Sequence, residues 1–404
     1  MKFTYTAITK EGKRIKASME ANDKFDLARQ LKNKNLSLVS AESEGEKKVF
    51  DMSAINAFLS RVKTHEKIIF ARNLAAMLDA GLALSRTLNI LERQTRNEKF
   101  KKIIRAIGED VKKGNSLSGA LEKFPKIFPP LFFSMVRAGE ESGGLVESLR
   151  VVADQMEKSY LMRKKIKGAL LYPTIIIFAM IVVGVLMLMF VVPTLTATFK
   201  ELGVELPKST QLIVSLSEFL VKYKVLLLPV FILIIFFLSL FFKTKRGKRI
   251  LDFTFLHIPV IGELVKKTNS AYTTRTLSSL LSAGVDILEA LSITKDVVQN
   301  SYYKEVIQQA GERIQKGEPL SVSFSEAEHL YPILVGEIME VGEETGKLSD
   351  MILEVALFYE GEVDSATKNM STIIEPFLMI VVGVVVGFFA IAMISPTYSL
   401  MEGI

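Results

Sequence analysis

An acidic, glycine-rich segment that occurs twice holds the side chains best suited to chemistry in this sequence of 404 residues. It reads Gly139-Glu140-Glu141-Ser142-Gly143 at its first occurrence and Gly342-Glu343-Glu344-Thr345-Gly346 at its second. Adjacent carboxylates can serve as an acid and a base. They can also bind a divalent cation, to which Glu147 or Asp154 would add an oxygen ligand.

Two other interpretations of these segments involve no reaction. A carboxylate near a helix N-terminus is stabilised by the helix dipole, and we expect long helices to begin at Leu145 and Leu348, directly after the segments. The alternative is an acidic patch that faces a partner. Under either interpretation, the residues expected to bind a partner or form a structural joint are Gly139, Glu140, Glu141, Gly143, Gly342, Glu343, Glu344 and Gly346.

Phosphate binding is excluded by the spacing of the second segment. Its glycines and Lys347 follow G-x-x-x-G-K, whereas a P-loop requires G-x-x-x-x-G-K and then Ser or Thr, where this chain has Leu348. The first segment carries Gly144 in place of the lysine.

Other catalytic and metal-binding patterns are missing as well. The three histidines, His65, His257 and His329, follow no metal-ligand spacing, and the sequence has no cysteine and no G-x-S-x-G motif. We therefore expect no catalytic residue, no cofactor and no metal.

The repeat extends far beyond the acidic segments. Gly139 and Gly342 lie 203 positions apart, and the same offset aligns Arg72 with Arg275 and Pro193 with Pro396. It also aligns Leu117-Ser118 with Leu320-Ser321. A repeat of this length indicates a duplicated domain rather than a solenoid.

Three apolar runs, 168–199, 225–242 and 376–401, contain no charged residue. Because about 20 apolar residues span the hydrocarbon core of a bilayer, we expect three transmembrane helices, at 168–192, 225–242 and 376–395. The middle run has only 18 residues, and a buried core helix is the alternative for it. Pro173 and Pro376 are expected in the first turn of their spans, where proline is tolerated.

The net charge of +7 could suggest nucleic-acid binding, but the lysine and arginine residues cluster next to the predicted spans. Their placement indicates a membrane as the partner rather than nucleic acid. By the positive-inside rule, both copies are cytoplasmic, and the segment 193–224 and the tail 396–404 lie outside. The basic residues next to the spans are expected to contact lipid headgroups; they are Arg163, Lys164, Lys165, Lys167, Lys243, Lys245 and Arg246.

Local patterns predict the remaining parts. Residues 1–40 alternate as a small ββαβ module, and 41–61 form a linker with a short amphipathic helix around Ile55. Helical periodicity predicts two cytoplasmic bundles of about six helices each, at 62–167 and 265–375, joined through a basic connector at 243–264. Gly81 is expected to end one helix and Ser85 to cap the next.

Taken together, these features resemble the inner-membrane platform proteins of type IV pilus assembly and type II secretion, the PilC/GspF family. The resemblance rests on Phe70-x-Arg72-x-Leu74 with Ala80-Gly81, on both acidic segments, and on the string from Pro193 to Thr210. One departure is Thr273, which stands where the first copy has Phe70.

The resemblance implies a non-enzymatic scaffold in the bacterial inner membrane. Such a platform couples a cytoplasmic assembly ATPase to the insertion or extraction of pilin or pseudopilin subunits. The implied partners also include other inner-membrane assembly proteins, membrane lipids and a second copy of the chain, with a dimer favoured. The alternative is a transporter or channel with duplicated halves, although transporter repeats usually bring many spans. A membrane-anchored enzyme would need a site that the sequence does not offer.

Overall fold

The computed structural model describes residues 2–9, 14–21, 24–33, 36–43, 61–201 and 207–402. The chain is mainly helical and divides into two compact units. The first unit consists of Met1–Arg61 with Thr95–Lys102, and the second contains the rest of the chain. The linker helix expected around Ile55 lies outside the described residues.

The N-terminal residues form a three-stranded antiparallel sheet and one helix. The sheet has the order β2-β1-β3, and its elements are β1 (Lys2–Thr9), β2 (Arg14–Glu20), α1 (Lys24–Asn33) and β3 (Leu36–Ser43). Alternation along β1 places Tyr5 and Ala7 on one face, where they pack against Leu27 and Leu31 of α1. The last strand extends three residues beyond the boundary predicted at residue 40.

The duplicated parts contain corresponding helices. The first copy contains α3 (Thr64–Asp79), α4 (Leu84–Gln94), α5 (Glu98–Lys112), α6 (Leu117–Glu122), α7 (Pro130–Ser142) and α8 (Leu145–Leu186). The second copy contains α13 (Ile261–Ser282), α14 (Ile287–Val297), α15 (Ser301–Ile314), α16 (Leu320–Ser325), α17 (Ile333–Thr345) and α18 (Leu348–Glu402). From α4 onward, each helix of the first copy begins 203 positions before its counterpart.

The prediction for the end of the helix at Gly81 agrees with the structure, whereas the prediction for the start of the next helix at Ser85 does not. Gly81 and its counterpart Gly284 both have φ of 81°, the left-handed conformation that ends a helix. Ser85 lies inside α4, which already begins at Leu84, so the prediction that it caps this helix is wrong.

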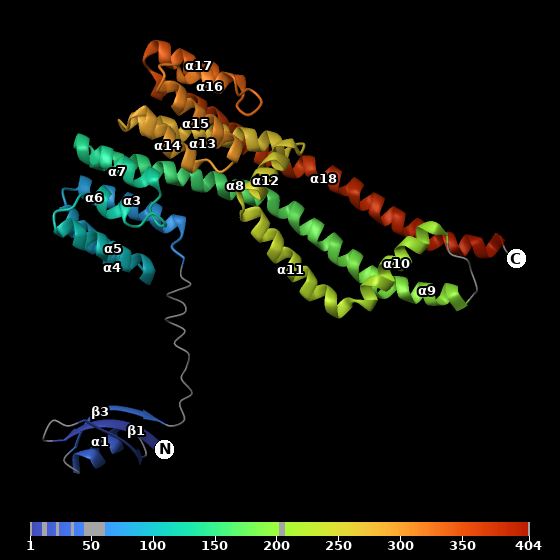
Figure 1. Cartoon of the computed structure of the whole chain (residues 1–404), viewed down its shortest axis with the longest axis horizontal. Helices are drawn as coiled ribbons and strands as arrows, with labels where there is room; N and C mark the ends of the chain where they lie inside the picture. Colours follow the sequence, from blue (N-terminus) through green and yellow to red (C-terminus); the bar gives the residue numbers. More distant parts are fainter. Residues whose placement is uncertain are drawn as a thin grey trace. The chain divides into compact units, whose positions relative to one another are not determined.

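Both long helices leave their bodies without a break (Figure 1). After α8 come a π-helical turn, η1 (Met187–Val191), and α9 (Val192–Glu201). Pro173 therefore lies deep inside α8, and Pro376 deep inside α18, so the expectation that each stands in a first helical turn is wrong. An interior proline removes one N–H donor and crowds the carbonyl four residues earlier, yet both helices continue past it.

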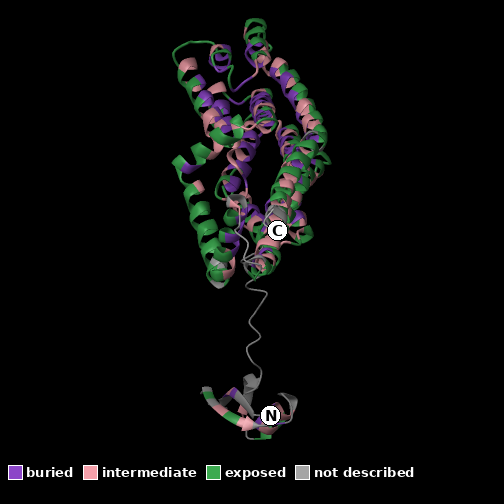
Figure 2. Cartoon of the chain, turned by 90° about the vertical axis from the view of Figure 1, so that its right-hand side faces the viewer, coloured by how far each residue is buried: buried purple, intermediate pink, exposed green. Residues whose placement is uncertain are grey.

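Two helical stretches are long and apolar enough to cross a membrane: Leu145–Thr198 and Leu348–Ile394. Between them in sequence lie α10 (Lys208–Lys222), α11 (Lys224–Lys243) and α12 (Lys245–His257). Buried residues are frequent in the helical bodies, whereas exposed residues cover much of the long helices (Figure 2).

The helix α10 joins the far parts of the two long helices. Its Ile213 and Val214 form a buried cluster with Val192 and Ala392. The Thr210 hydroxyl donates to the Ala392 carbonyl at 2.6 Å, and the Ser217 hydroxyl donates to the Leu188 carbonyl at 2.5 Å. These bonds satisfy polar groups that would otherwise be buried without partners.

The two copies also contact each other near the bodies, where α8 packs along α18. Lys165 of α8 forms an ion pair with Asp364 of α18, and Lys368 lies 2.8 Å from the same carboxylate. Hydrogen bonds from Lys165 first and Lys368 second lower the pKa of Asp364 from 3.8 to about 2.

Replacing Asp364 with Asn should destabilise the chain in a pH-dependent way. Because the folded pKa is depressed, the stabilisation is present above about pH 4 and disappears as the pH falls through about 2. The melting midpoint of the wild type in detergent should exceed that of Asp364→Asn near neutral pH, and the gap should close on acidification. Glu354→Gln, at an exposed position of α18, is the control. A gap that does not change with pH would contradict this account.

The copies preserve two ion pairs in different ways. Arg72–Glu157 joins α3 to α8, and its counterpart Arg275–Glu360 joins α13 to α18 through two hydrogen bonds of 2.7 and 2.9 Å. In the other conserved ion pair, the positive and negative residues have exchanged positions. Lys123 binds Asp110 at 2.6 Å in the first copy, and the equivalent residues Glu326 and Arg313 bind each other at 2.6 Å in the second. Opposite charge has been kept while both residues changed.

This exchange predicts a compensating pair of substitutions. Asp110→Arg alone places two positive groups together and should lower the melting midpoint by about 2 °C, the scale of a partly exposed ion pair. Adding Lys123→Glu should restore the midpoint. The reverse exchange in the second copy, Arg313→Asp with Glu326→Lys, is the matched test. Additive losses in the double variants would show that the pairs are not coupled.

Candidate functional site

Each acidic segment forms the last turn of one helix and the connection to a long helix. The first segment ends α7 at Ser142, and the second ends α17 at Thr345. Gly143 and Gly346 follow with φ of 75° and 66°, so each adopts the left-handed conformation at the helix C-terminus. The long helices α8 and α18 begin two residues later.

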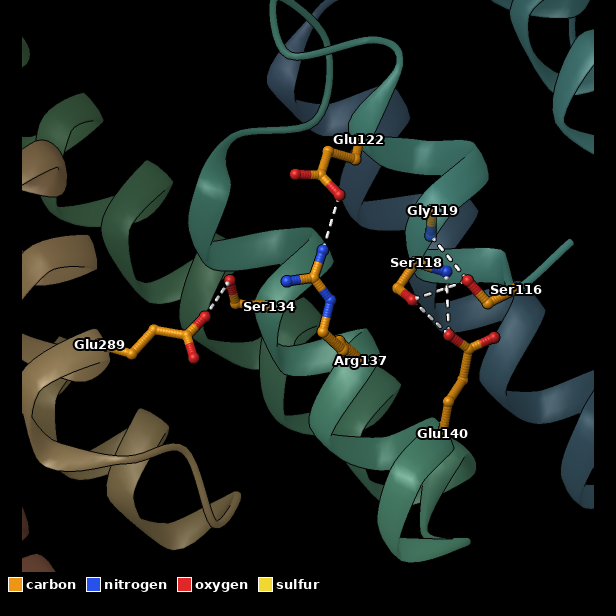
Figure 3. A network of polar contacts seen from close by, with 8 residues as sticks. All are labelled: Ser116, Ser118, Gly119, Glu122, Ser134, Arg137, Glu140 and Glu289. Carbon is orange, nitrogen blue, oxygen red and sulfur yellow. Dashed lines mark hydrogen bonds and ion pairs between the residues drawn. The ribbon is translucent and has the colours of Figure 1, made fainter.

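The first glutamate of each segment caps a short helix. The Glu140 carboxylate accepts a hydrogen bond from the backbone N–H group of Leu117 (2.6 Å). It also accepts from the N–H group (3.0 Å) and the hydroxyl (2.5 Å) of Ser118 (Figure 3). Glu343 accepts from the N–H groups of Leu320 and Ser321 at 2.6 and 3.0 Å. A carboxylate at this position satisfies N-terminal donors that have no partner within the helix.

The capped helices are α6 and α16, so the prediction that these carboxylates cap α8 and α18 is wrong. Helical side chains point back toward the N-terminus of their own helix. Glu140 therefore faces α6, which precedes α7, rather than α8, which follows it.

The two short helices depend on these glutamates to different degrees. In α6, Ser116 also caps, because its hydroxyl accepts from the N–H of Gly119 at 3.1 Å. The corresponding residue before α16 is Pro319, which has no side-chain oxygen. Glu343 is thus the described side-chain cap of α16, and α16 should be the more sensitive to loss of its glutamate.

The second glutamate of each segment has a different environment. Glu141 and Glu344 are exposed, whereas Glu140 and Glu343 are partly buried. The paired carboxylates are thereby separated, one toward the body and one toward solvent. This arrangement does not suit an acid and base pair, because Glu140 already accepts three hydrogen bonds.

The divalent-cation alternative gains no support from the geometry. Glu147 lies 3.7 Å from Arg150, with its side chain 72% exposed, and Asp154 is exposed. Among the described residues, no group of three or more His, Cys, Asp or Glu side chains is placed to hold a metal ion.

Gly139 and Gly342 allow the helices of each joint to approach closely. A Cβ atom at Gly139 would lie 2.5 Å from the Ser148 hydroxyl oxygen and 3.0 Å from the Leu145 Cα. At Gly342 it would lie 2.9 Å from the Leu348 Cα. Both glycines thus bring the backbone of one helix against the first turn of the next. Together with the capping glutamates, they make each acidic segment a packed joint.

The basic residues predicted to contact lipid divide into two groups. Arg163 lies 5.6 Å from the centre of the Tyr272 ring, and Lys165 is paired with Asp364, so both bind the second copy of the repeat. The side chains of the other predicted residues are exposed; they are Lys164, Lys167, Lys243, Lys245 and Arg246.

Sequence reasoning missed the contacts that link the two copies. The Ser134 hydroxyl donates to Glu289 at 3.1 Å (Figure 3), and the buried Gln155 amide donates to the Thr276 hydroxyl at 3.0 Å. Neither pair has a sequence signal, because the partners lie more than a hundred positions apart and are not related by the repeat offset.

Comparison with known proteins agrees with the duplicated plan. A family model described as type II secretion system (T2SS) protein F matches residues 70–193 and again residues 273–396. The model of that protein's N-terminal domain matches residues 1–42. The two longer matches are themselves offset by 203 positions, so the family model covers one copy of the repeat.

Curated relatives align along the whole chain. The chain is 37% identical to the type IV pilus assembly protein PilC of Thermus thermophilus, over 99% of this chain and 98% of that protein. It is 33% identical to PilC of Myxococcus xanthus, over 100% of this chain and 95% of that protein. It is 28% identical to the type II secretion system protein F of Vibrio cholerae, over 98% of this chain and 97% of that protein. The predicted resemblance is confirmed.

The capping geometry predicts unequal effects for the two glutamates of a segment. Glu140→Ala leaves two N–H groups of α6 without their acceptor and should lower the free energy of unfolding by about 1–3 kcal/mol. Glu141→Ala removes an exposed side chain and should cost less than about 0.5 kcal/mol. Denaturant titration of the full chain in detergent would measure both, and Glu343→Ala with Glu344→Ala repeats the comparison. Equal losses within a pair would contradict the assignment.

Proposed function

Because the chain belongs to the family of type II secretion system protein F, we propose that it is an inner-membrane platform protein of a type IV pilus assembly system. The observation that carries this proposal is the full-length similarity to relatives named for pilus assembly, at 33% to 37% identity in two of them. A type II secretion system is the related alternative, since a relative of that name is 28% identical. The platform acts as a scaffold and carries out no reaction itself.

The proposed membrane placement uses three helical segments. Residues 168–192 of the α8 region and 376–395 of α18 cross the membrane, and 225–242 of α11 form the third span. Exposed apolar side chains support the lipid contact; examples are Phe178, Phe190, Phe231, Ile235, Phe377 and Val384. The N-terminal module and the bodies at 62–167 and 265–375 are cytoplasmic, together with the connector 243–264. Residues 193–224 and 396–404 lie on the other side.

Exposed basic residues support this orientation. Lys243, Lys245 and Arg246 stand where α11 meets α12, and Lys164 and Lys167 stand before the first span. All five would be within reach of anionic headgroups on the cytoplasmic face. Arg163 and Lys165 are left out of this proposal, because they contact the second copy.

Coupling follows from the continuity of the long helices. A cytoplasmic assembly ATPase would act on the bodies, and pilin subunits, whose apolar helices leave the bilayer, would meet the spans. Because α8 and α18 run from the acidic joints into the apolar segments, a tilt or rotation of a body would move its span. The exposed Glu141 and Glu344 are the proposed partner-facing residues of the joints, whereas Glu140 and Glu343 keep them rigid.

The proposal is tested by deletion and complementation. Deleting the gene should abolish surface pili and leave protein export intact, and the wild-type chain should restore the pili. Loss of export with normal pili would assign the chain to secretion instead, and loss of neither would refute the platform role.

A second experiment addresses the partner-facing residues. A photoreactive residue at Glu141 or Glu344 should form crosslinks to the assembly ATPase in cells that assemble pili. The same group at Arg93, an exposed residue near the end of α4, a helix outside the joint, is the control. Crosslinks at the control position alone would refute the assignment of this surface.

A further inference from the structure

The two copies of the repeat contact each other through unlike surfaces. The first copy contributes α7 and α8, with Ser134 and Gln155. The second contributes α13 and α14, with Thr276 and Glu289 as the partners, and α18, which packs along α8. The Tyr272 hydroxyl also donates to a carbonyl of α8. Apart from the pairing of α8 with α18, the helices in contact are not equivalent in the repeat. Such an interface is heterologous. Each copy therefore uses one surface in the contact. The surface that corresponds, through the repeat, to the one used by the other copy takes no part in it.

The repeat offset identifies these two remaining surfaces. On the second copy, Glu337 of α17 and Phe358 of α18 occupy the positions of Ser134 and Gln155. We call these two residues the α17/α18 surface. On the first copy, the positions of Tyr272, Thr276 and Glu289 are occupied by Ile69, Asn73 and Arg86, which we call the α3/α4 surface.

The exposure of the two surfaces sets them apart from their counterparts. Gln155 is 1% exposed and Tyr272 8%, whereas Phe358 is 52% exposed and Ile69 44%. Leu357, next to Phe358, is 45% exposed. Phe358 and Ile69 are thus open at the positions where the internal contact buries Gln155 and Tyr272. Open apolar groups of this kind mark interaction surfaces.

The two surfaces are also complementary to each other. Where Ser134 meets Glu289, the equivalent residues are Glu337 and Arg86, which carry opposite charges and are both exposed. Where Gln155 lies against Thr276, the equivalent contact would place Phe358 beside Asn73 and the neighbouring Ile69. A polar contact would be replaced by an apolar one with a charged pair at its edge, an arrangement typical of protein interfaces.

We propose that a second copy of this chain covers these surfaces, with the α17/α18 surface of one chain packed on the α3/α4 surface of the next. The contact repeats between chains the arrangement already present within one chain. It keeps all long helices parallel, because α8 and α18 run side by side in one direction: Lys165 meets Asp364 near the bodies, and α10 bridges Leu188 and Ala392 further along.

The absence of cysteine from the sequence allows a direct crosslinking test. Two differently tagged full-length chains, one with Asn73→Cys and one with Phe358→Cys, would be co-expressed and treated in membranes with a short bifunctional maleimide. A covalent heterodimer should form only when both variants are present. Each variant expressed alone is the matched control and should give no covalent dimer. Self-crosslinking of the Phe358→Cys chain, or no crosslink in the mixture, would overturn the proposal.

Charge reversal gives an independent measurement on the same contact. Glu337→Arg and Arg86→Glu should each weaken self-association in detergent by roughly tenfold, and the double variant should return close to the wild type. Both positions are exposed, and an unchanged melting midpoint would show that the fold is intact. Failure of the double variant to recover would overturn the proposal. These measurements score self-association alone, so their outcome is separate from that of the pilus assay.

Discussion

A carboxylate bound to the N-terminal N–H groups of a six-residue helix organises each body of this chain. Glu140 and Glu343 make this contact from the last turns of α7 and α17, and both do so with the same two distances of 2.6 and 3.0 Å. The short helices α6 and α16 cannot satisfy their own first donors. The carboxylates therefore fix these helices against α7 and α17, and the adjacent Gly139 and Gly342 fix those in turn against α8 and α18.

One ion pair that both copies keep has a different environment in each copy. Arg72 is 53% exposed in its pair with Glu157, whereas Arg275 is 11% exposed in the equivalent pair with Glu360. The difference arises because α13 contacts both α18 and α8, and its residues from Asn269 to Leu280 are all buried. The same interaction is therefore partly solvated in one copy and desolvated in the other. A desolvated pair is costly to break, because either charge would be left without a partner.

Much of this arrangement could be predicted from the sequence. The repeat offset fixes the helix starts from α4 onward, since glycines and prolines recur at equal spacing and end helices for local reasons. The direction of Glu140 could not be predicted, because it depends on which short helix lies beside α7 in space. The interior position of Pro173 in α8 was missed, because proline weakens a helix without always standing in its first turn. Lys165 was predicted to contact lipid headgroups because it stands before an apolar run. Its actual partner, Asp364, lies 199 positions away in the sequence and gives no local signal.

The bridge formed by α10 has a mechanical consequence. The long helices α8 and α18 are tied near the bodies by Lys165 and Asp364, and again at their far parts through Thr210 and Ser217 of α10. Two parallel helices that are linked at two places along their length cannot slide past each other without breaking one of these contacts. Under the proposed function, a push on either body would therefore move both long helices together, as a common tilt or turn.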